Sequence, residues 1–214
     1  MLFRSDVVGA ALAAALGEWT GRPCVLIDSM GQGREEDLLN ADLTPTVGFF
    51  TAYLPLLVQG AGQRDLHSLA RDVQRQRESR AHLLLQVARA MTDDAALARR
   101  LSEVPRAQVL LNYIGQRQEL GVAGLDAALL APAPEDAGPT HAPDGLRGHP
   151  LALKASVGAD GLHLTFVYSG ALHRRETILS LAQRCLTLLA QAALPPTPPG
   201  AARGAGVQPG RGGS

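Results

Sequence analysis

Five carboxylates in one short stretch are the side chains best suited to acid–base chemistry. They are Asp28, Glu35, Glu36, Asp37 and Asp42. Paired carboxylates can take up and return protons during a reaction. A charge-rich loop is more commonly hydrated and has no chemistry of its own, and we favour this second interpretation.

The glycine pair Gly31 and Gly33, separated by Gln32, allows two interpretations. Glycine-rich loops can cradle phosphate groups, but this one lacks the Gly-Lys-Ser/Thr ending of a P-loop. It also lacks the third glycine of a dinucleotide-binding turn. The sequence therefore predicts a tight turn after a strand, in which a glycine takes a positive φ.

The histidines are scattered and do not form a metal-binding pattern. None stands at metal-ligand spacing from another histidine or a cysteine, and no serine lies in a Gly-x-Ser-x-Gly motif. We predict neither a metal site nor a serine nucleophile. The histidines are His67, His82, His141, His149, His163 and His173. His67 and His82 fall in expected helices, and His163 should point outward from a strand.

Composition excludes several classes of function. The chain has 214 residues, 46% of them apolar, and its 20 basic and 20 acidic residues cancel. A neutral chain does not attract nucleic acid over long distances. No apolar run reaches the roughly 20 residues of a membrane span, and no secretory signal is evident, so we expect a cytoplasmic protein.

Cys24 and Cys185 lie in apolar runs and are predicted to be buried free thiols.

Apolar periodicity predicts an α/β fold with a mixed sheet. The first helix should be capped by Ser5 or Asp6 and end at Gly21, and 29–46 should be loop. Pro55 should mark a strand edge or bulge, and Asp160 with Gly161 a hairpin turn. Strands are expected at 23–28, 47–58, 107–114, 151–157 and 162–168, helices at 6–19, from Asp65, at 82–91, after Asp93 or Asp94, and at 175–192, and a loop at 117–150.

Five segments, in order, resemble the C-terminal half of a condensation or epimerisation domain of nonribosomal peptide synthetases. They are "DVVGAALAAALGEW", "MGQGRE" (compare EGHGRE), "TPTVGFFTAYLP" (RTVGWFTxxYP), "LLNYIGQR" (FNYLGQR) and "VYSGALHRRETILSLAQRCLTLL". They span residues 6 to about 192. The NYxGQ ending favours the epimerisation-type branch, which includes the post-condensation region.

This resemblance implies half of a chloramphenicol-acetyltransferase-like domain, with a mixed sheet flanked by helices over residues 1–193. A disordered Pro/Gly-rich tail should follow at 194–214. In the family, two halves form a V around a substrate tunnel. The implied partners are therefore the N-terminal half, a peptidyl carrier protein bearing phosphopantetheine, and neighbouring synthetase domains. The resemblance implies no cofactor bound directly.

The chain departs from the family where chemistry is expected. It has no His-His pair and hence no HHxxxDG motif. Met30 stands at the glutamate of EGHGRE, Gln32 at its histidine and Leu54 at the tyrosine of the third motif. No catalytic residue is expected, and Tyr113, Asn112 and Glu35 are only weak candidates. The matching motif positions are Gly31, Gly33, Arg34, Glu35, Thr46, Val47, Gly48, Phe50, Thr51, Pro55, Asn112, Tyr113, Gly115 and Gln116.

Two functions of different class follow from the resemblance. In the first, the chain is part of a condensation or epimerisation domain that makes secondary metabolites such as peptide antibiotics, and it works only with a missing N-terminal half. In the second, it is a non-catalytic docking or remnant module that binds a carrier protein or a neighbouring domain. An independent enzyme ranks third.

Overall fold

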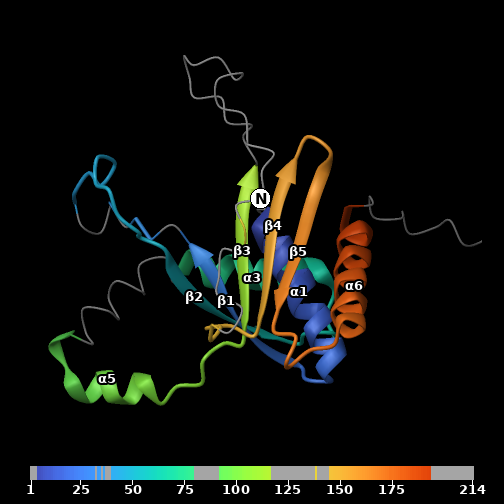
Figure 1. The fold of residues 1–214 in the computed structure, drawn as a ribbon, viewed down its shortest axis with the longest axis horizontal. Helices are drawn as coiled ribbons and strands as arrows, with labels where there is room; N and C mark the ends of the chain where they lie inside the picture. Colours follow the sequence, from blue (N-terminus) through green and yellow to red (C-terminus); the bar gives the residue numbers. More distant parts are fainter. Residues whose placement is uncertain are drawn as a thin grey trace, which may run out of the picture.

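A five-stranded mixed sheet forms the centre of the molecule, in the order β2-β1-β3-β4-β5 (Figure 1). The computed structural model describes residues 4–31, 33–34, 36, 40–79, 92–116, 138 and 145–193. The middle strands β1, β3 and β4 run parallel, and β2 and β5 pair antiparallel at the two edges. The strands are β1 (Cys24–Gly31), β2 (Ala52–Gln59), β3 (Val109–Gln116), β4 (Leu151–Gly158) and β5 (Gly161–Tyr168).

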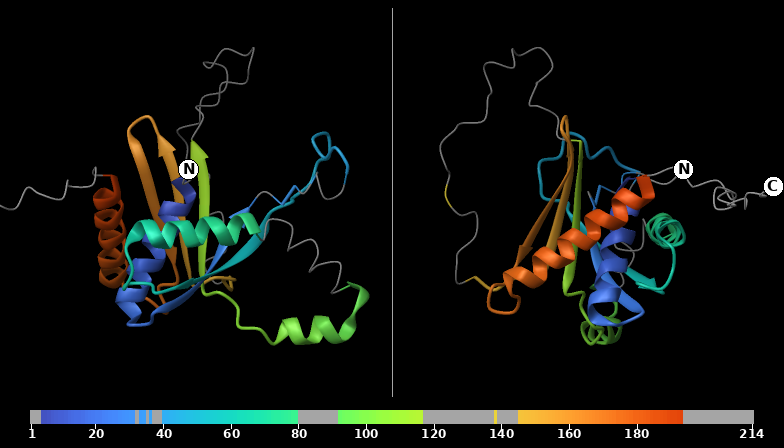
Figure 2. Two further views of the ribbon diagram at one scale, coloured as in Figure 1. Left: turned by 180° about the vertical axis from the view of Figure 1, so that it is seen from behind. Right: turned by 90° about the vertical axis from the view of Figure 1, so that its right-hand side faces the viewer.

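Three helices cover one face of this sheet, and the other face has no described helix over it (Figure 2). They are α1 (Arg4–Thr20), α3 (Leu66–Ser79) and α6 (Arg175–Ala193). The short helix α5 (Ala95–Ser102) has no buried residue and lies away from the sheet (Figure 1). Among the described helices, none combines the length and apolar character that crossing a bilayer requires.

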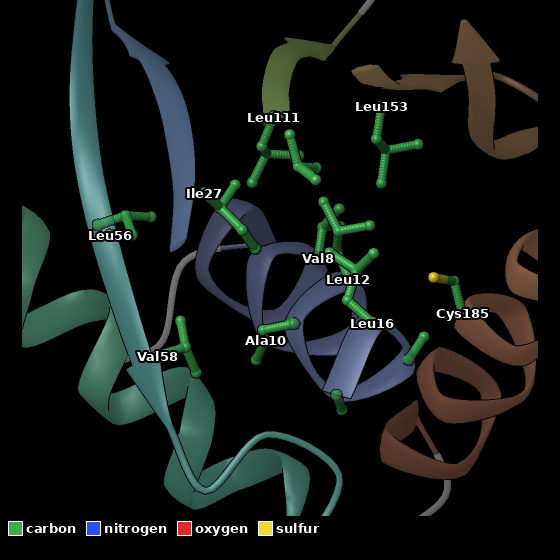
Figure 3. Packing of buried hydrophobic residues seen from close by; sticks show 14 of the residues in the cluster. Val8, Ala10, Leu12, Leu16, Ile27, Leu56, Val58, Leu111, Leu153 and Cys185 are labelled. Atoms are coloured by element: carbon green, nitrogen blue, oxygen red, sulfur yellow. The ribbon is translucent and has the colours of Figure 1, made fainter. Parts of the chain in front are cut away.

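The helix α1 is the centre of the core because its side chains are small. It packs against the sheet and against both other helices, and every residue from Val8 to Gly17 is buried. Val8 and Leu12 lie on the side of the helix toward Leu111 and Leu153 of the sheet (Figure 3), and Leu16 and Ile27 belong to the same buried cluster. A helix that is apolar on all sides is expected to be buried in this way.

Most predicted strands and helices are confirmed, with shifts at their ends. The hairpin turn is Ala159-Asp160, one residue earlier than predicted, and Gly161 opens β5 with φ 127°. Pro55 lies on the edge strand β2 opposite Asp28, in a regular register without a bulge. The helix predicted at 82–91, His82, His141, most of the 117–150 loop and the 194–214 tail lie outside the described residues.

Two strand boundaries were predicted wrongly. The strand expected from Val47 begins only at Ala52. The preceding residues belong to the long connection between β1 and β2 (32–51, called the excursion below), in which Val47 and Phe49 are exposed. Conversely, β1 continues to Gly31, inside the stretch predicted as loop, because its pairing with β2 extends to Gly31 opposite Ala52. Tertiary pairing decided both boundaries.

The prediction that Ser5 or Asp6 caps the first helix is also wrong. The helix begins at Arg4, and Asp6 is fully buried within its first turn. Arg77 of α3 donates from Nε to Asp6 Oδ1 at 2.9 Å and from a second nitrogen to Oδ2 at 3.3 Å. This bidentate ion pair joins α1 to α3.

Replacing Arg77 with alanine should destabilise the fold strongly, because the buried Asp6 carboxylate would lose its bidentate ion pair. We expect a loss of about 3 kcal/mol in the free energy of unfolding, measured by urea denaturation. Arg75 is the matched control on the same helix: it pairs with Asp72 at the surface, and Arg75→Ala should cost less than about 1 kcal/mol. Equal losses for both variants would contradict this account.

The two cysteines are both free but differ in exposure. Cys24 is the first residue of β1 and is exposed. The prediction that it is buried is therefore wrong. Cys185 is buried against α1, with Sγ 3.9 Å from the carbonyl oxygen of Ala11. Burial raises the pKa of the Cys185 thiol to about 12.

At pH 8 a thiol reagent should therefore modify Cys24 in the folded chain and leave Cys185 untouched until the chain is unfolded. Mass spectrometry of the intact protein would count the labels. The pKa of Cys185 is higher in the folded chain than in the unfolded chain. The neutral thiol therefore contributes its full stabilisation of the fold at pH values below the unfolded-state pKa, and this contribution is lost as the pH rises toward 12. The stability difference between wild type and Cys185→Ala should therefore narrow above about pH 9. Labelling of Cys185 as fast as Cys24 would contradict the burial.

Candidate functional site

The motif positions of the sequence gather at one end of the sheet. Gly31 ends β1 and Gln116 ends β3, and these two strands are parallel. Parallel pairing therefore brings the carboxyl ends of the two strands to the same side. Near the end of β3, the register against β4 shifts between Tyr113 and Gly115, and Gly115 has φ 85°.

A tight turn after β1 begins the long excursion to β2. Gly33 has φ 64°, which agrees with the predicted turn. The guanidinium of Arg34 donates to the carbonyl oxygens of Leu43 and Thr46 and lies 4.3 Å from the centre of the Phe50 ring. Arg34 thus ties both arms of the excursion together. Its motif position serves the fold of this segment.

The loop carboxylates bind backbone groups of the same excursion. Glu36 Oε1 accepts a hydrogen bond from the Leu43 amide at 3.0 Å. Asp42 Oδ1 accepts one from the Thr44 amide at 2.9 Å, and hydrogen bonding to Thr44 lowers the pKa of Asp42. Glu35 and Asp37 lie outside the described residues. The described loop carboxylates shape the loop and do not form a facing acid–base pair.

The candidates Asn112 and Tyr113 lie on opposite faces of the sheet. Successive residues of a strand point to opposite sides. Tyr113 packs against the buried cluster under the helices, beside Ala155 of β4. Asn112 lies on the uncovered face, across from Lys154. These two side chains therefore cannot act on one substrate atom.

An unpredicted histidine–carboxylate pair lies on the uncovered face. His149 Nε2 is 2.8 Å from Asp28 Oδ2, and both side chains are largely buried. The ring of Tyr53 lies 5.5 Å from the imidazole, centre to centre. Such a carboxylate orients an imidazole, whose other nitrogen can exchange a proton. The residues are 121 positions apart, and no sequence pattern links them.

The uncovered face is apolar over much of its area. Leu57 and Tyr53 of β2 are 41% and 44% exposed, and Leu26, Leu110 and Val167 are half-buried there. A groove of about 750 Å³ lies elsewhere, at the amino ends of the parallel strands, between the Trp19 and Pro105 segments. The motif positions and this groove are thus at opposite ends of the sheet.

The two motif glycines should respond differently to substitution. A Cβ at Gly33 would lie 1.8 Å from the carbonyl oxygen of Phe50, on a backbone with positive φ. A Cβ at Gly31 would meet only the Ala52 oxygen at 3.9 Å. Gly33→Ala should therefore cost about 1–3 kcal/mol of unfolding free energy in chemical denaturation, and Gly31→Ala less than about 1 kcal/mol. A Gly33→Ala variant as stable as Gly31→Ala would refute the strained turn.

Known proteins are similar to this chain in sequence. The chain is 38% identical to chondramide synthase cmdD of Chondromyces crocatus over 83% of its own length. It is 28% identical to tyrocidine synthase 1 of Brevibacillus parabrevis over 84% of its own length. It spans only 4% of the first relative and 17% of the second.

A solved structure also resembles it. The epimerization domain from the third module of tyrocidine synthetase B superposes with a TM-score of 0.72 at 23% identity, covering 89% of this chain and 41% of that domain. The fold is therefore the chloramphenicol-acetyltransferase-like one that the sequence resemblance implied. The model of the family described as "Condensation domain" matches residues 4–201. By this match over most of its length, the chain belongs to the condensation domain family.

Proposed function

We propose that this chain is the C-terminal half of an epimerisation-type condensation domain and takes part in nonribosomal peptide synthesis together with an N-terminal half. The observation that carries the proposal is the meeting of two motif segments, Gly31–Arg34 and Asn112–Gln116, at the carboxyl ends of β1 and β3. The 41% share of the tyrocidine synthetase epimerization domain that this chain covers fits a half domain.

The uncovered face of the sheet supports a partner half. Leucines at 26, 57 and 110 present apolar area there, and transferring apolar surface out of water stabilises an interface by about 25 cal/mol per Å². On this proposal, a peptidyl carrier protein delivers its substrate on a phosphopantetheine arm, and neighbouring synthetase domains complete the assembly. The chain would act in the cytoplasm. The docking-module alternative has no separate support among the described residues.

The described residues of this chain supply structure more than proton transfer. Epimerisation needs a base at the α-carbon and a group that returns the proton on the other face, each within hydrogen-bond reach. Met30 stands where the family has a glutamate, and a thioether neither takes nor gives a proton. Tyr113 packs into the core side of the sheet. We therefore expect the partner half to supply the acid–base groups that Met30 and Tyr113 cannot provide.

The chain by itself should neither epimerise nor condense carrier-bound aminoacyl groups. The assay is deuterium exchange at the α-carbon of an aminoacyl carrier protein incubated with the chain. We expect exchange no faster than with carrier protein alone, because general acid–base help worth about a hundred- to ten-thousand-fold per group is missing. Clear exchange would overturn the proposal, and its loss in a Tyr113→Phe variant would make Tyr113 catalytic.

The uncovered face should bind an apolar fluorescent dye in the purified chain, because it presents apolar side chains to water. A Leu57→Lys/Leu110→Lys double variant should lower the fluorescence severalfold. Val104→Lys is the control, since Val104 is 54% exposed but lies beside α5, away from the sheet. Absence of dye binding, or an equal decrease in the control, would contradict an open partner face.

A further inference from the structure

The two edges of the sheet are finished differently, and the β2 edge is closed. The side-chain amide of Gln76 on α3 donates to the Leu57 carbonyl at 2.9 Å and accepts from the Leu57 amide at 3.0 Å. Arg64 donates to the carbonyl of Gln59 at 3.3 Å. Alternate residues of a strand face the same edge, and the next one, Pro55, has no N–H. This edge is protected against pairing with another strand.

The β5 edge carries none of these protections. Ser169 donates to the Pro150 carbonyl at 2.9 Å, so the odd-numbered residues of this strand bond inward to β4. Leu162, Leu164, Phe166 and Tyr168 then present their N–H and C=O groups outward. The strand ends the sheet, and within the described part of the chain no other strand pairs with it. It contains no proline and no lysine, the residues that commonly blunt such edges.

We propose that β5 pairs antiparallel with β5 of a second copy of this chain, about a two-fold axis at Thr165. The result is a dimer with one continuous sheet across both copies. A two-fold interface requires a surface that complements itself. The sequence of β5 and the charges at its two ends meet that requirement.

Side chains match across this register. The pairs on the helix-covered face are Leu164 with Phe166 and Leu162 with Tyr168, all apolar. On the other face, His163 meets Val167 and Thr165 meets itself. Aliphatic–aromatic and Thr–Thr cross-strand pairs are favourable, and no two like charges oppose each other.

Exposed leucines beside the strand extend the surface. Leu162 is 38% exposed, although it lies on the helix-covered side. On α6, which lies next to β5 (Figure 1), Leu179 and Leu186 are 55% and 43% exposed. They are seven residues apart and so fall near one line along the helix. A second copy seated on this edge would cover apolar side chains as well as backbone groups.

Charge also favours a second copy in the antiparallel direction. The turn that precedes β5 carries Asp160, which lies 2.6 Å from His163 Nε2 of its own copy, whereas the segment after the strand carries Arg174 and Arg175, followed by Glu176. Antiparallel pairing brings the acidic end of each copy toward the basic end of the other. A parallel arrangement would place like charges together.

The test is the mass of the full chain in sedimentation, with charges placed at the axis. Thr165 is exposed, so Thr165→Lys and Thr165→Glu should fold, and circular dichroism would verify it. Each variant alone should dimerise about five- to tenfold more weakly than wild type, because two like charges meet directly. An equimolar mixture of the two should regain the wild-type affinity, since Lys then meets Glu.

Leu57→Lys is the matched control, because it adds a lysine to the same uncovered face at the opposite edge. It should leave the dimer unchanged. If Leu57→Lys weakens association as much as Thr165→Lys, the copies meet through the uncovered face and the proposal fails. A wild-type chain that stays monomeric at high micromolar concentration also overturns it.

Cysteine cross-linking tests the register independently. In a Cys24→Ser background, Thr165→Cys should form a disulfide-linked dimer under mild oxidation, because directly opposed residues of this pair type have Cα atoms about 4.5 Å apart. His163→Cys or Val167→Cys alone should link much less, and a mixture of the two should link efficiently. Equal linking by all three single variants would contradict the two-fold axis at Thr165.

Discussion

The close approach of α1 to its neighbours is the constraint on which the rest of the fold depends. Its small side chains let the sheet and both other helices pack closely against it. A Cβ at Gly9 would lie 3.2 Å from the Leu111 side chain, and one at Gly17 would lie 2.5 Å from the backbone of Ala61. Close-packed interiors tolerate no such addition without movement. The buried Asp6–Arg77 pair then ties α1 to α3 in a single arrangement.

Because all three packed helices lie on one side, the sheet has a sealed face and an uncovered face. The parallel middle strands bring the ends of β1 and β3 together, and the antiparallel edges are treated unequally. Gln76 can close the β2 edge only because α3 packs beside that strand. The same packing order leaves the outer edge of β5 without a described strand beside it, and it leaves Leu179 and Leu186 of α6 exposed.

The motif positions that the structure describes mainly shape the backbone. Gly33 permits the turn after β1, and Arg34 holds the two arms of the excursion. Met30, which the resemblance places at the glutamate of EGHGRE, carries a thioether, and Tyr113 faces the core. The His149–Asp28 pair on the uncovered face joins the loop before β4 to β1.

Local patterns in the sequence determined the kinds of element and their order. The apolar runs, the helical face of α6 and the hairpin between β4 and β5 were predicted because a few neighbouring residues specify each of them. The resemblance supplied the motif positions of the candidate site. Their roles as site residues stay predictions, and Glu35 lies outside the described part of the chain.

Tertiary structure decided what depends on residues distant in the chain. Asp6 and Arg77 are 71 residues apart in the sequence, and Asp28 and His149 are 121 residues apart. No local pattern specifies either contact. The end of β1 at Gly31, the start of β2 at Ala52 and the exposure of Cys24 likewise follow from which strand pairs with which. Cross-strand pairing and burial are properties of the assembled sheet, so a single segment cannot encode them by itself.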